Sequence, residues 1–442
     1  MTDAGKGLSE VEMRLQLIDE SVNFSCGSCT FCCDQPWRTL IEIDKAEALS
    51  RHDFGAYPQL SGRTLYRRSS DGNGELYELS KGEGTRCLFL DTDGLCIIHK
   101  ELGAEAKPGM CRQFPYLSSR TWTDDRVSAN FGCPSVQKRS GSCLSEQAGE
   151  IASVVPVSAR PARPDQPVMF DMALKITPAE NGALLDRAIG IFEDGADGNV
   201  WDRFAKLLGL LVAVGACKRV GVESDVVELL RSGGDLPNTP QVPPIRAFEP
   251  VAAAPMPIRF LFAATLYPDT VPADAGSRMG LFKKLSLVPK LMSLAQMSGS
   301  YASRVLGRNV AVREVLEHEV APEPEASALL LRYFRSRFWH RTMVGTRLPI
   351  VGGVHQHVQD LNAIIFFARA EAQASGARCM SVALVRRALT AVEFHLANQP
   401  RLHEQTLKGR LRTQLCDPEL AMQSLRLMAP ARAGSPVCVS AG

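Results

Sequence analysis

The feature that most constrains this chain is a run of closely spaced cysteines, CGSCTFCC, from Cys26 to Cys33. A two-residue spacing lets successive thiolates converge on one metal centre while the intervening amides point at the sulfurs, so zinc knuckles and iron–sulfur sites both use it. Neighbouring side chains in a chain usually project in different directions, so Cys32 and Cys33 are not expected to share one ion easily. We therefore expect them to serve different metals, or one of them to be a spare.

Other cysteines follow at wider intervals, so that nine of the 13 cysteines lie in the first 150 of the 442 residues. Four of these later thiols bring the number of candidate ligands to eight, which is enough for two four-sulfur sites or for one complete cluster beside a mixed site. A bacterial ferredoxin run has a longer third interval than this one, which weakens an electron-carrier interpretation. The predicted metal ligands are Cys26, Cys29, Cys32, Cys33, Cys87, Cys96, Cys111 and Cys133.

Two β-hairpins are predicted between the first and the later cysteines. Gly, Asn and Asp residues supply the reversal of a hairpin over 65–79 and of a second one with arms 86–90 and 95–99. Cys87 and Cys96 stand on opposite arms of the second hairpin, so both sulfurs can face one site.

Helical patterns dominate after residue 170, with few strand signals. Thr177-Pro-Ala-Glu180 is a capping box that predicts a helix to about Glu193. Apolar residues at spacings of three and four predict further helices. These are 200–217, 224–231, 278–298, 302–318, 325–344, 356–374 and 381–397.

Proline-rich stretches at 156–167 and 237–257 predict linkers. The fold class is therefore α+β, with a small cysteine-rich metal-binding domain containing short hairpins before a mostly α-helical region. The predicted parts are a cysteine-cluster domain (1–150), a helical segment (151–257), a helical C-terminal domain (258–428) and a disordered tail (429–442).

Composition and charge limit the partners. Fifty basic and 48 acidic residues give a net charge of +2, which removes any global electrostatic argument for nucleic acid or anionic lipid. The longest apolar stretch, Leu207 to Cys217, is too short to span a membrane. The first residues show no signal-peptide pattern. We therefore expect a cytoplasmic protein, where a reducing environment makes disulfides the weaker explanation for the cysteines.

Combined, the motifs resemble a known family. CGSCTFCC, then CLFLDTDGLCIIH from Cys87, CRQFP from Cys111 and the dipeptide Cys133-Pro134 resemble the bacterial zinc- or iron-chelating cysteine-cluster family. Within it, the chain is most similar to the flagellin lysine N-methylase group. The match covers roughly residues 20 to 140 and includes all eight candidate ligands, but not Cys143.

This resemblance implies a metal–thiolate site, either a [4Fe-4S] iron–sulfur cluster or zinc. It also implies S-adenosylmethionine as the methyl donor and a protein lysine as the acceptor. Two alternatives stay open: a non-catalytic zinc- or iron-binding module with a structural or interaction role, and an iron–sulfur oxidoreductase or electron carrier. The chain lacks a GxGxxG motif after a strand, so an ordinary Rossmann methyltransferase is not supported.

Several polar residues near the cysteines are candidates for a role in such a site. Arg112 could orient a carboxylate of the methyl donor or form a structural salt bridge. His99 could replace a thiolate ligand. Asp91, Glu78 and Tyr116 are candidates for the base that deprotonates the target lysine, each with a structural role as its alternative.

Three features of the later chain have less specific interpretations. His355 and His357 could bind metal, but lack a third ligand nearby and favour a helix start. The basic and aromatic stretch 329–342 could contact nucleic acid, but fits a helix with an aromatic core face and a solvated basic face better. Cys217 and Cys379 are expected to be small hydrophobic residues within apolar helices.

Overall fold

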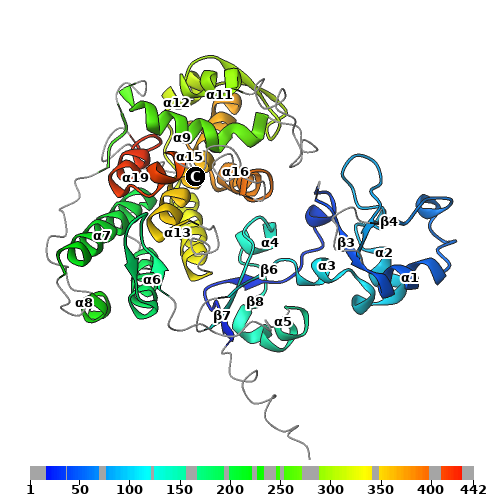
Figure 1. Cartoon of the computed structure of the whole chain (residues 1–442). Helices are drawn as coiled ribbons and strands as arrows, with labels where there is room; N and C mark the ends of the chain where they lie inside the picture. The colour runs from blue at the N-terminus through cyan, green and yellow to red at the C-terminus, as the bar shows by residue number, and fades with distance from the viewer. Residues whose placement is uncertain are drawn as a thin grey trace, which may run out of the picture. The chain divides into compact units, whose positions relative to one another are not determined.

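The computed structural model describes most of the chain and divides it into two compact units. One, here the cysteine-rich unit, comprises residues 16–118 and 127–159; the other, the helical unit, includes 119–126 and the chain from 160 onward. Short strands and short helices make up the first, and long helices dominate the second (Figure 1), which confirms the α+β prediction. The described residues are 16–35, 37–68, 76–120, 124–155, 167–193, 199–221, 226–232, 245–248, 253–270, 288–340, 348–397 and 410–430.

The predicted domain boundaries at residues 150 and 257 stay predictions. Most of the tail predicted to be disordered, 431–442, lies outside the described residues.

Short elements follow one another closely in the first 159 residues. The strands pair in the orders β3-β5-β4, β2-β8 and β1-β7-β6. The strands are β1 (Gln16–Ile18), β2 (Asn23–Phe24), β3 (Leu40–Glu42), β4 (Tyr66–Arg68), β5 (Leu76–Leu79), β6 (Tyr116–Arg120), β7 (Asp125–Ala129) and β8 (Ser142–Cys143). The α-helices are α1 (Ile43–Arg51), α2 (Ile97–Leu102), α3 (Gly109–Gln113), α4 (Pro134–Gln137) and α5 (Ala148–Val154), and the 3-10 helices are η1 (Phe31–Cys33), η2 (Pro58–Leu60), η3 (Ala104–Ala106) and η4 (Leu144–Gln147).

The first predicted hairpin is confirmed, because β4 and β5 pair antiparallel with Arg68 opposite Tyr77; its turn residues lie outside the described residues. The second is wrong in its second arm. The chain does reverse, since the Asp91 N–H donates to the Leu95 carbonyl at 2.9 Å, but α2 begins at Ile97. Ile97 and Ile98 are buried in the unit's core, and this tertiary packing outweighs their preference for strands.

That core is compact and lies directly beside two of the candidate ligands. Phe89 is fully buried and meets Phe54 edge to face, with ring centroids 5.8 Å apart. Cys87 and Cys96 pack against the same cluster. The apolar core therefore fixes the position of both cysteines.

The helical unit contains longer helices and two small hairpins. Its α-helices are α6 (Pro178–Glu193), α7 (Val200–Val220), α8 (Val226–Ser232), α9 (Met256–Leu266), α11 (Val288–Ala295), α12 (Val312–Glu317), α13 (Pro324–Trp339), α15 (Ile350–Ser375), α16 (Val382–Ala391), α18 (Arg410–Leu415) and α19 (Pro418–Leu425). Its other elements are the strands β9 (Val168–Met169), β10 (Lys175–Ile176), β11 (Ser300–Ser303) and β12 (Arg308–Ala311), the 3-10 helix η6 (Tyr267–Thr270) and the π-helix η7 (Val392–Ala397).

The centre of this unit is α15. Every residue from Ile350 to Ala370 is buried, and α9, α16 and α19 pack around the helix (Figure 1). A helix that is covered on all sides organises its neighbours, since each of them buries an apolar face against it.

The predicted helix over 302–318 is wrong in its first half. Residues there form the β11–β12 hairpin, which turns at Gly307 with a φ of 63°. The buried Asp269 carboxylate accepts hydrogen bonds from Ser303 Oγ at 2.6 Å and from the Val305 N–H at 2.7 Å. This distant carboxylate stabilises the turn, and local periodicity could not reveal it.

The basic and aromatic stretch lies mainly on α13. Three of its rings, those of Tyr333, Phe334 and Phe338, are buried as predicted. Its arginines are not on a solvated face, because Arg335 and Arg337 are half-buried and pair with Glu193 and Glu393. Arg341 lies outside the described residues. Within the parts of the chain described, each helix is too short or too polar to cross a bilayer.

The predicted capping box at the start of α6 is confirmed. The Glu180 N–H donates to Thr177 Oγ1 at 3.1 Å, and the Thr177 N–H donates to Glu180 Oε2 at 2.8 Å. Lys218 of α7 also reaches the Glu180 carboxylate, at 2.8 Å. Two otherwise unpaired helix N–H groups are thus satisfied.

We expect Thr177→Ala to lower the free energy of unfolding by about 1 kcal/mol, because the Glu180 N–H loses its acceptor. Urea unfolding followed by circular dichroism measures this change. Ser300→Ala, on the exposed start of β11, is the control and should change stability by less than about 0.5 kcal/mol. Equal stability of the two variants would contradict the role of the cap.

Candidate metal centre

Five of the eight predicted ligands surround one cavity in the cysteine-rich unit. Its volume is about 120 Å³. Rings and aliphatic side chains form much of its wall, and no Asp or Glu is among its described lining residues. The thiols are those of Cys32, Cys33, Cys87, Cys96 and Cys111.

The first two thiols are positioned by a tight turn before them. Thr30 has a φ of 60°, and the Cys33 N–H donates to the Thr30 carbonyl at 2.8 Å, which closes the 3-10 turn of η1. The Cys87 N–H donates in turn to the Cys33 carbonyl at 2.7 Å. Backbone bonding therefore holds two distant cysteines beside each other.

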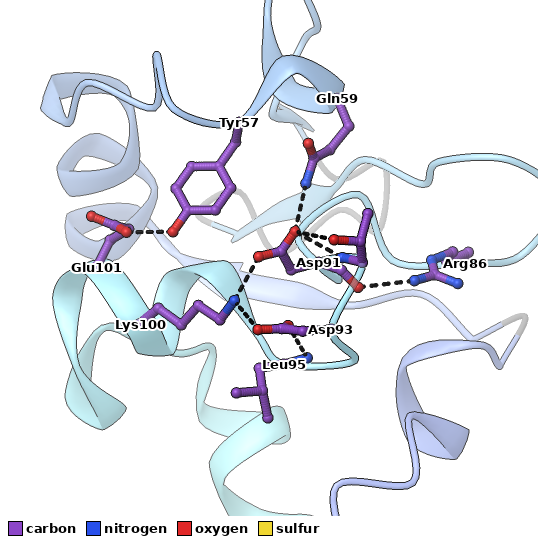
Figure 2. Close-up of polar contacts among 9 residues, drawn as sticks. Tyr57, Gln59, Arg86, Asp91, Asp93, Leu95, Lys100 and Glu101 are labelled. Atoms are coloured by element: carbon purple, nitrogen blue, oxygen red, sulfur yellow. Dashed lines mark hydrogen bonds and ion pairs between the residues drawn. The ribbon is translucent and has the colours of Figure 1, made fainter.

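A polar network fixes the reversal between Cys87 and Cys96. Figure 2 shows the Lys100 ammonium between the carboxylates of Asp91 and Asp93, each 2.5 Å away. Gly94 has a φ of 82° and packs close to Thr30, so a side chain there would meet both strain and a contact of 3.1 Å. The reversal thus directs Cys96 back toward the cavity.

Cys111 reaches the cavity from α3. The Glu42 carboxylate accepts the Gly109 N–H at 3.1 Å, and the Lys45 ammonium donates to the Lys107 carbonyl at 2.9 Å. These contacts tie the start of α3 to β3 and α1.

Backbone N–H groups donate to the sulfurs of Cys87 and Cys96, outside the two-residue run in which the sequence predicts such amides. The N–H of Phe89 donates to Cys87, and those of Ile98 and His99 donate to Cys96. Hydrogen bonds of this kind stabilise a thiolate and tune a metal bound to it.

Without a cation the cavity favours neutral thiols. Burial raises the pKa of Cys87 to about 11 and that of Cys111 to about 12, and it also raises the pKa of Cys96. A hydrogen bond with Cys32 raises the pKa of Cys33 far above its ordinary value. A coordinated thiol is deprotonated outright, so metal binding must release these protons.

The other three predicted ligands form a separate group. Cys26 and Cys29 are exposed, whereas Cys133 is buried at the start of α4. Gly27 approaches Ser135 Oγ closely enough that a Cβ would stand 3.3 Å away, and the Cys26 and Cys29 thiols act electrostatically on Cys133. The cysteine run therefore divides: its first half approaches α4, and its second half lines the cavity.

The sulfurs of Cys32 and Cys33 are 4.0 Å apart and face the same cavity. Two sulfurs bound to one tetrahedral ion at about 2.3 Å would stand roughly 3.8 Å apart. Although the two cysteines are adjacent in the sequence, their sulfurs are therefore close enough to bind the same ion. Which of them binds metal stays a prediction.

The size of the cavity bears on what it can hold. In the described residues, no three His, Cys, Asp or Glu side chains already converge at metal-binding distances. The thiols instead line a void of about 120 Å³, close to the roughly 150 Å³ of a cavity that admits benzene.

Comparison with known proteins gives a distant relationship. The chain is 27% identical over 120 residues to Flagellar biosynthetic protein FliU of Salmonella muenchen, which covers 26% of this chain and 70% of that protein. It is 26% identical over 111 residues to an uncharacterized protein of Methanocaldococcus jannaschii, covering 25% of this chain and 35% of the archaeal protein. The chain thus spans only about a third of that relative. No family model and no solved structure matches the chain.

The other polar candidates do not line the cavity. Arg112 pairs with Glu105, which is the salt-bridge alternative that the sequence left open, and its role toward a methyl donor stays a prediction. Glu78 is buried between Arg38 and Arg67. His99 is exposed on α2.

Two further candidates are poor bases. The hydrogen bond from Lys100 lowers the pKa of the Asp91 carboxyl, so it holds a proton less readily. Tyr116 is buried and donates to Gln147 Oε1 at 3.1 Å, and burial raises its pKa to about 12. Forming the tyrosinate that could accept a proton is therefore unfavourable.

The two histidines considered as metal ligands in the later chain are buried within a helix. His355 and His357 lie inside α15, which begins at Ile350 rather than at the histidines. His355 bonds to the Leu415 carbonyl and to Ser424 Oγ, and burial lowers its pKa to about 4.

Three cysteines outside the eight also have settled positions. Cys217 is buried in α7 as expected, whereas Cys379 lies in the bend after α15 and is disulfide-bonded. Cys143 Sγ donates to the Glu20 carbonyl at 2.9 Å.

Sequence reasoning missed the non-cysteine walls of the cavity. Trp37 and Phe114 meet edge to face at 5.3 Å, and Lys81, Lys107 and Met110 also line it. The only sequence signal for this lining role is that most of these residues lie close to a cysteine along the chain.

We expect Cys87 and Cys111 of the metal-free protein to alkylate at least on the order of a hundredfold more slowly at pH 8 than in the denatured chain, where thiols titrate near 8.5. A raised pKa means that the reactive thiolate appears only as the pH rises toward about 11 and 12. Iodoacetamide labelling followed by mass spectrometry measures each site. Labelling at the denatured rate would contradict the burial of these thiols.

Proposed function

We propose that the cysteine-rich unit binds a metal–thiolate centre in its cavity and that the protein transfers a methyl group from S-adenosylmethionine to a protein lysine. The observation that carries the first part is that thiols from four separate segments meet around one cavity whose described lining contains no Asp or Glu. Cys33, Cys87, Cys96 and Cys111 are the proposed ligands, with Cys32 as the alternative to Cys33.

An iron–sulfur cluster is the proposed occupant. The void of about 120 Å³ supports this choice, because it approaches the size of a cavity that admits benzene. The N–H groups that donate to Cys87 and Cys96 are also typical of iron–sulfur sites, where they tune the potential.

The methyl-transfer proposal rests on resemblance. The cysteine motifs are similar to those of the flagellin lysine N-methylase group, and the distant relative FliU carries a flagellar biosynthetic name. When bound, a cluster held by only three of these thiolates would leave one iron open for the amino-acid end of S-adenosylmethionine, whereas a cluster held by all four would not. A protein lysine, and flagellin in particular, is the proposed substrate.

Transfer requires the target lysine to be neutral, since its nitrogen lone pair forms the new N–CH₃ bond as the S–CH₃ bond breaks and the thioether leaves. The lysine proton must therefore go to a base. Asp91, Glu78 and Tyr116 are engaged in structural contacts away from the cavity. We assign the proton to none of them; it passes to water or to a substrate-borne group.

A structural role for the metal is the second candidate function. Cys87 and Cys96 pack directly on the core of their unit, so a metal joining them would staple α2 and the loop before it to η1 and α3. Structural zinc sites contribute on the order of 10 kcal/mol or more to folding.

Metal, sulfide and spectral analysis of the full chain purified without oxygen tests both proposals. We expect iron and sulfide in equal amounts, a visible absorption that changes on adding S-adenosylmethionine, and methylated lysines in flagellin detected by mass spectrometry. Cys111→Ala should lose the cavity centre, whereas Cys143→Ala, whose sulfur bonds to backbone, should retain it.

Other outcomes would overturn these assignments. Colourless, zinc-loaded protein without methyl transfer would establish the structural role. A brown protein with a reversible one-electron couple and no methyl transfer would indicate an electron carrier. Full metal content in both Cys87→Ala and Cys111→Ala would remove the proposed centre.

A further inference from the structure

We propose that Lys81 and Lys107, whose side chains line the cavity, are the counter-charges that neutralise the proposed thiolate centre. This inference rests on the metal-binding part of the proposed function, and not on methyl transfer. It assigns a role to two side chains that the cysteine motifs do not include.

Both lysines are placed by the fold to face the cavity. Lys81 lines the wall and its ammonium donates to the Gln35 carbonyl at 3.1 Å. The backbone of Lys107 is held by the hydrogen bond from Lys45 and by the buried Pro108 that follows it. The fold therefore fixes where the side chain of each lysine leaves the cavity wall.

The charges of these lysines act on the thiols. Lys107 lies close enough to influence Cys33, Cys96 and Cys111, and Lys81 acts on Cys87. Among the described residues, Lys107 forms no ion pair with a carboxylate. An unpaired ammonium beside several sulfurs is suited to an anionic occupant.

Charge balance gives the physical reason. Four thiolates carry four negative charges, while a zinc ion or an oxidised [4Fe-4S] core carries two positive ones, so the bound centre keeps two negative charges. An uncompensated charge among rings and aliphatic side chains is costly. Two lysines supply the two missing positive charges, and the absence of an acid from the described lining leaves them free to do so.

Cobalt titration of the metal-free full chain tests this role without any assay of activity, because thiolate-to-cobalt absorption reports binding directly. We expect Lys107→Gln and Lys81→Gln each to weaken cobalt binding about tenfold, since each removes one nearby positive charge. Lys107→Arg should retain the affinity of the original protein. Reconstitution with iron and sulfide gives a second readout, in which Lys107→Gln makes the midpoint potential more negative and Lys107→Arg does not.

Lys138→Gln is the matched control, because Lys138 is an exposed lysine of the same unit beyond α4. If it weakens binding as much as Lys107→Gln does, the effect comes from net charge and the proposal is overturned. Unchanged affinity in both cavity variants, while Cys111→Ala fails to bind, would also overturn the role of the lysines and leave the centre intact. Normal cobalt binding by Cys87→Ala and Cys111→Ala would instead remove the proposed centre itself.

Discussion

The arrangement depends on bringing buried thiols together where water cannot solvate their charge. Burial raises the pKa of Cys87 and Cys111, so the cavity holds them as neutral thiols until a cation replaces their protons. The same burial makes a thiolate–metal bond strong once it forms, because the surroundings are apolar. With the metal proposed above, the site would have two stable states, protonated and metal-bound.

The two units differ in the core that stabilises each of them. In the helical unit, every residue of α15 from Ile350 to Ala370 is buried, and the imidazole of His355 bonds to Ser424 Oγ at 2.9 Å. The cysteine-rich unit has short elements around a small core that includes Phe89 and the flanks of Cys87 and Cys96. Small cores of this kind commonly need an added cross-link, which the proposed metal would supply.

Much of the fold was predictable where the signal was local. The capping box of α6 needs only Thr177 and Glu180, and both contacts form as the residue types require. Errors arose where distant residues decided the outcome. Asp269 stabilises the β11–β12 turn from another part of the chain, and burial in the core selects a helix after Cys96.

The sequence by itself determined which residues could act as ligands, since two-residue cysteine spacing and the later single cysteines have few other physical uses. Only the tertiary structure decided how these thiols divide, with Cys33 beside Cys87 at one cavity and Cys26 near Cys133 elsewhere. It also placed Lys81 and Lys107 on the cavity wall. Spacing along the chain limits which neighbouring thiols can meet, but long-range packing alone determines which distant segments surround the same volume.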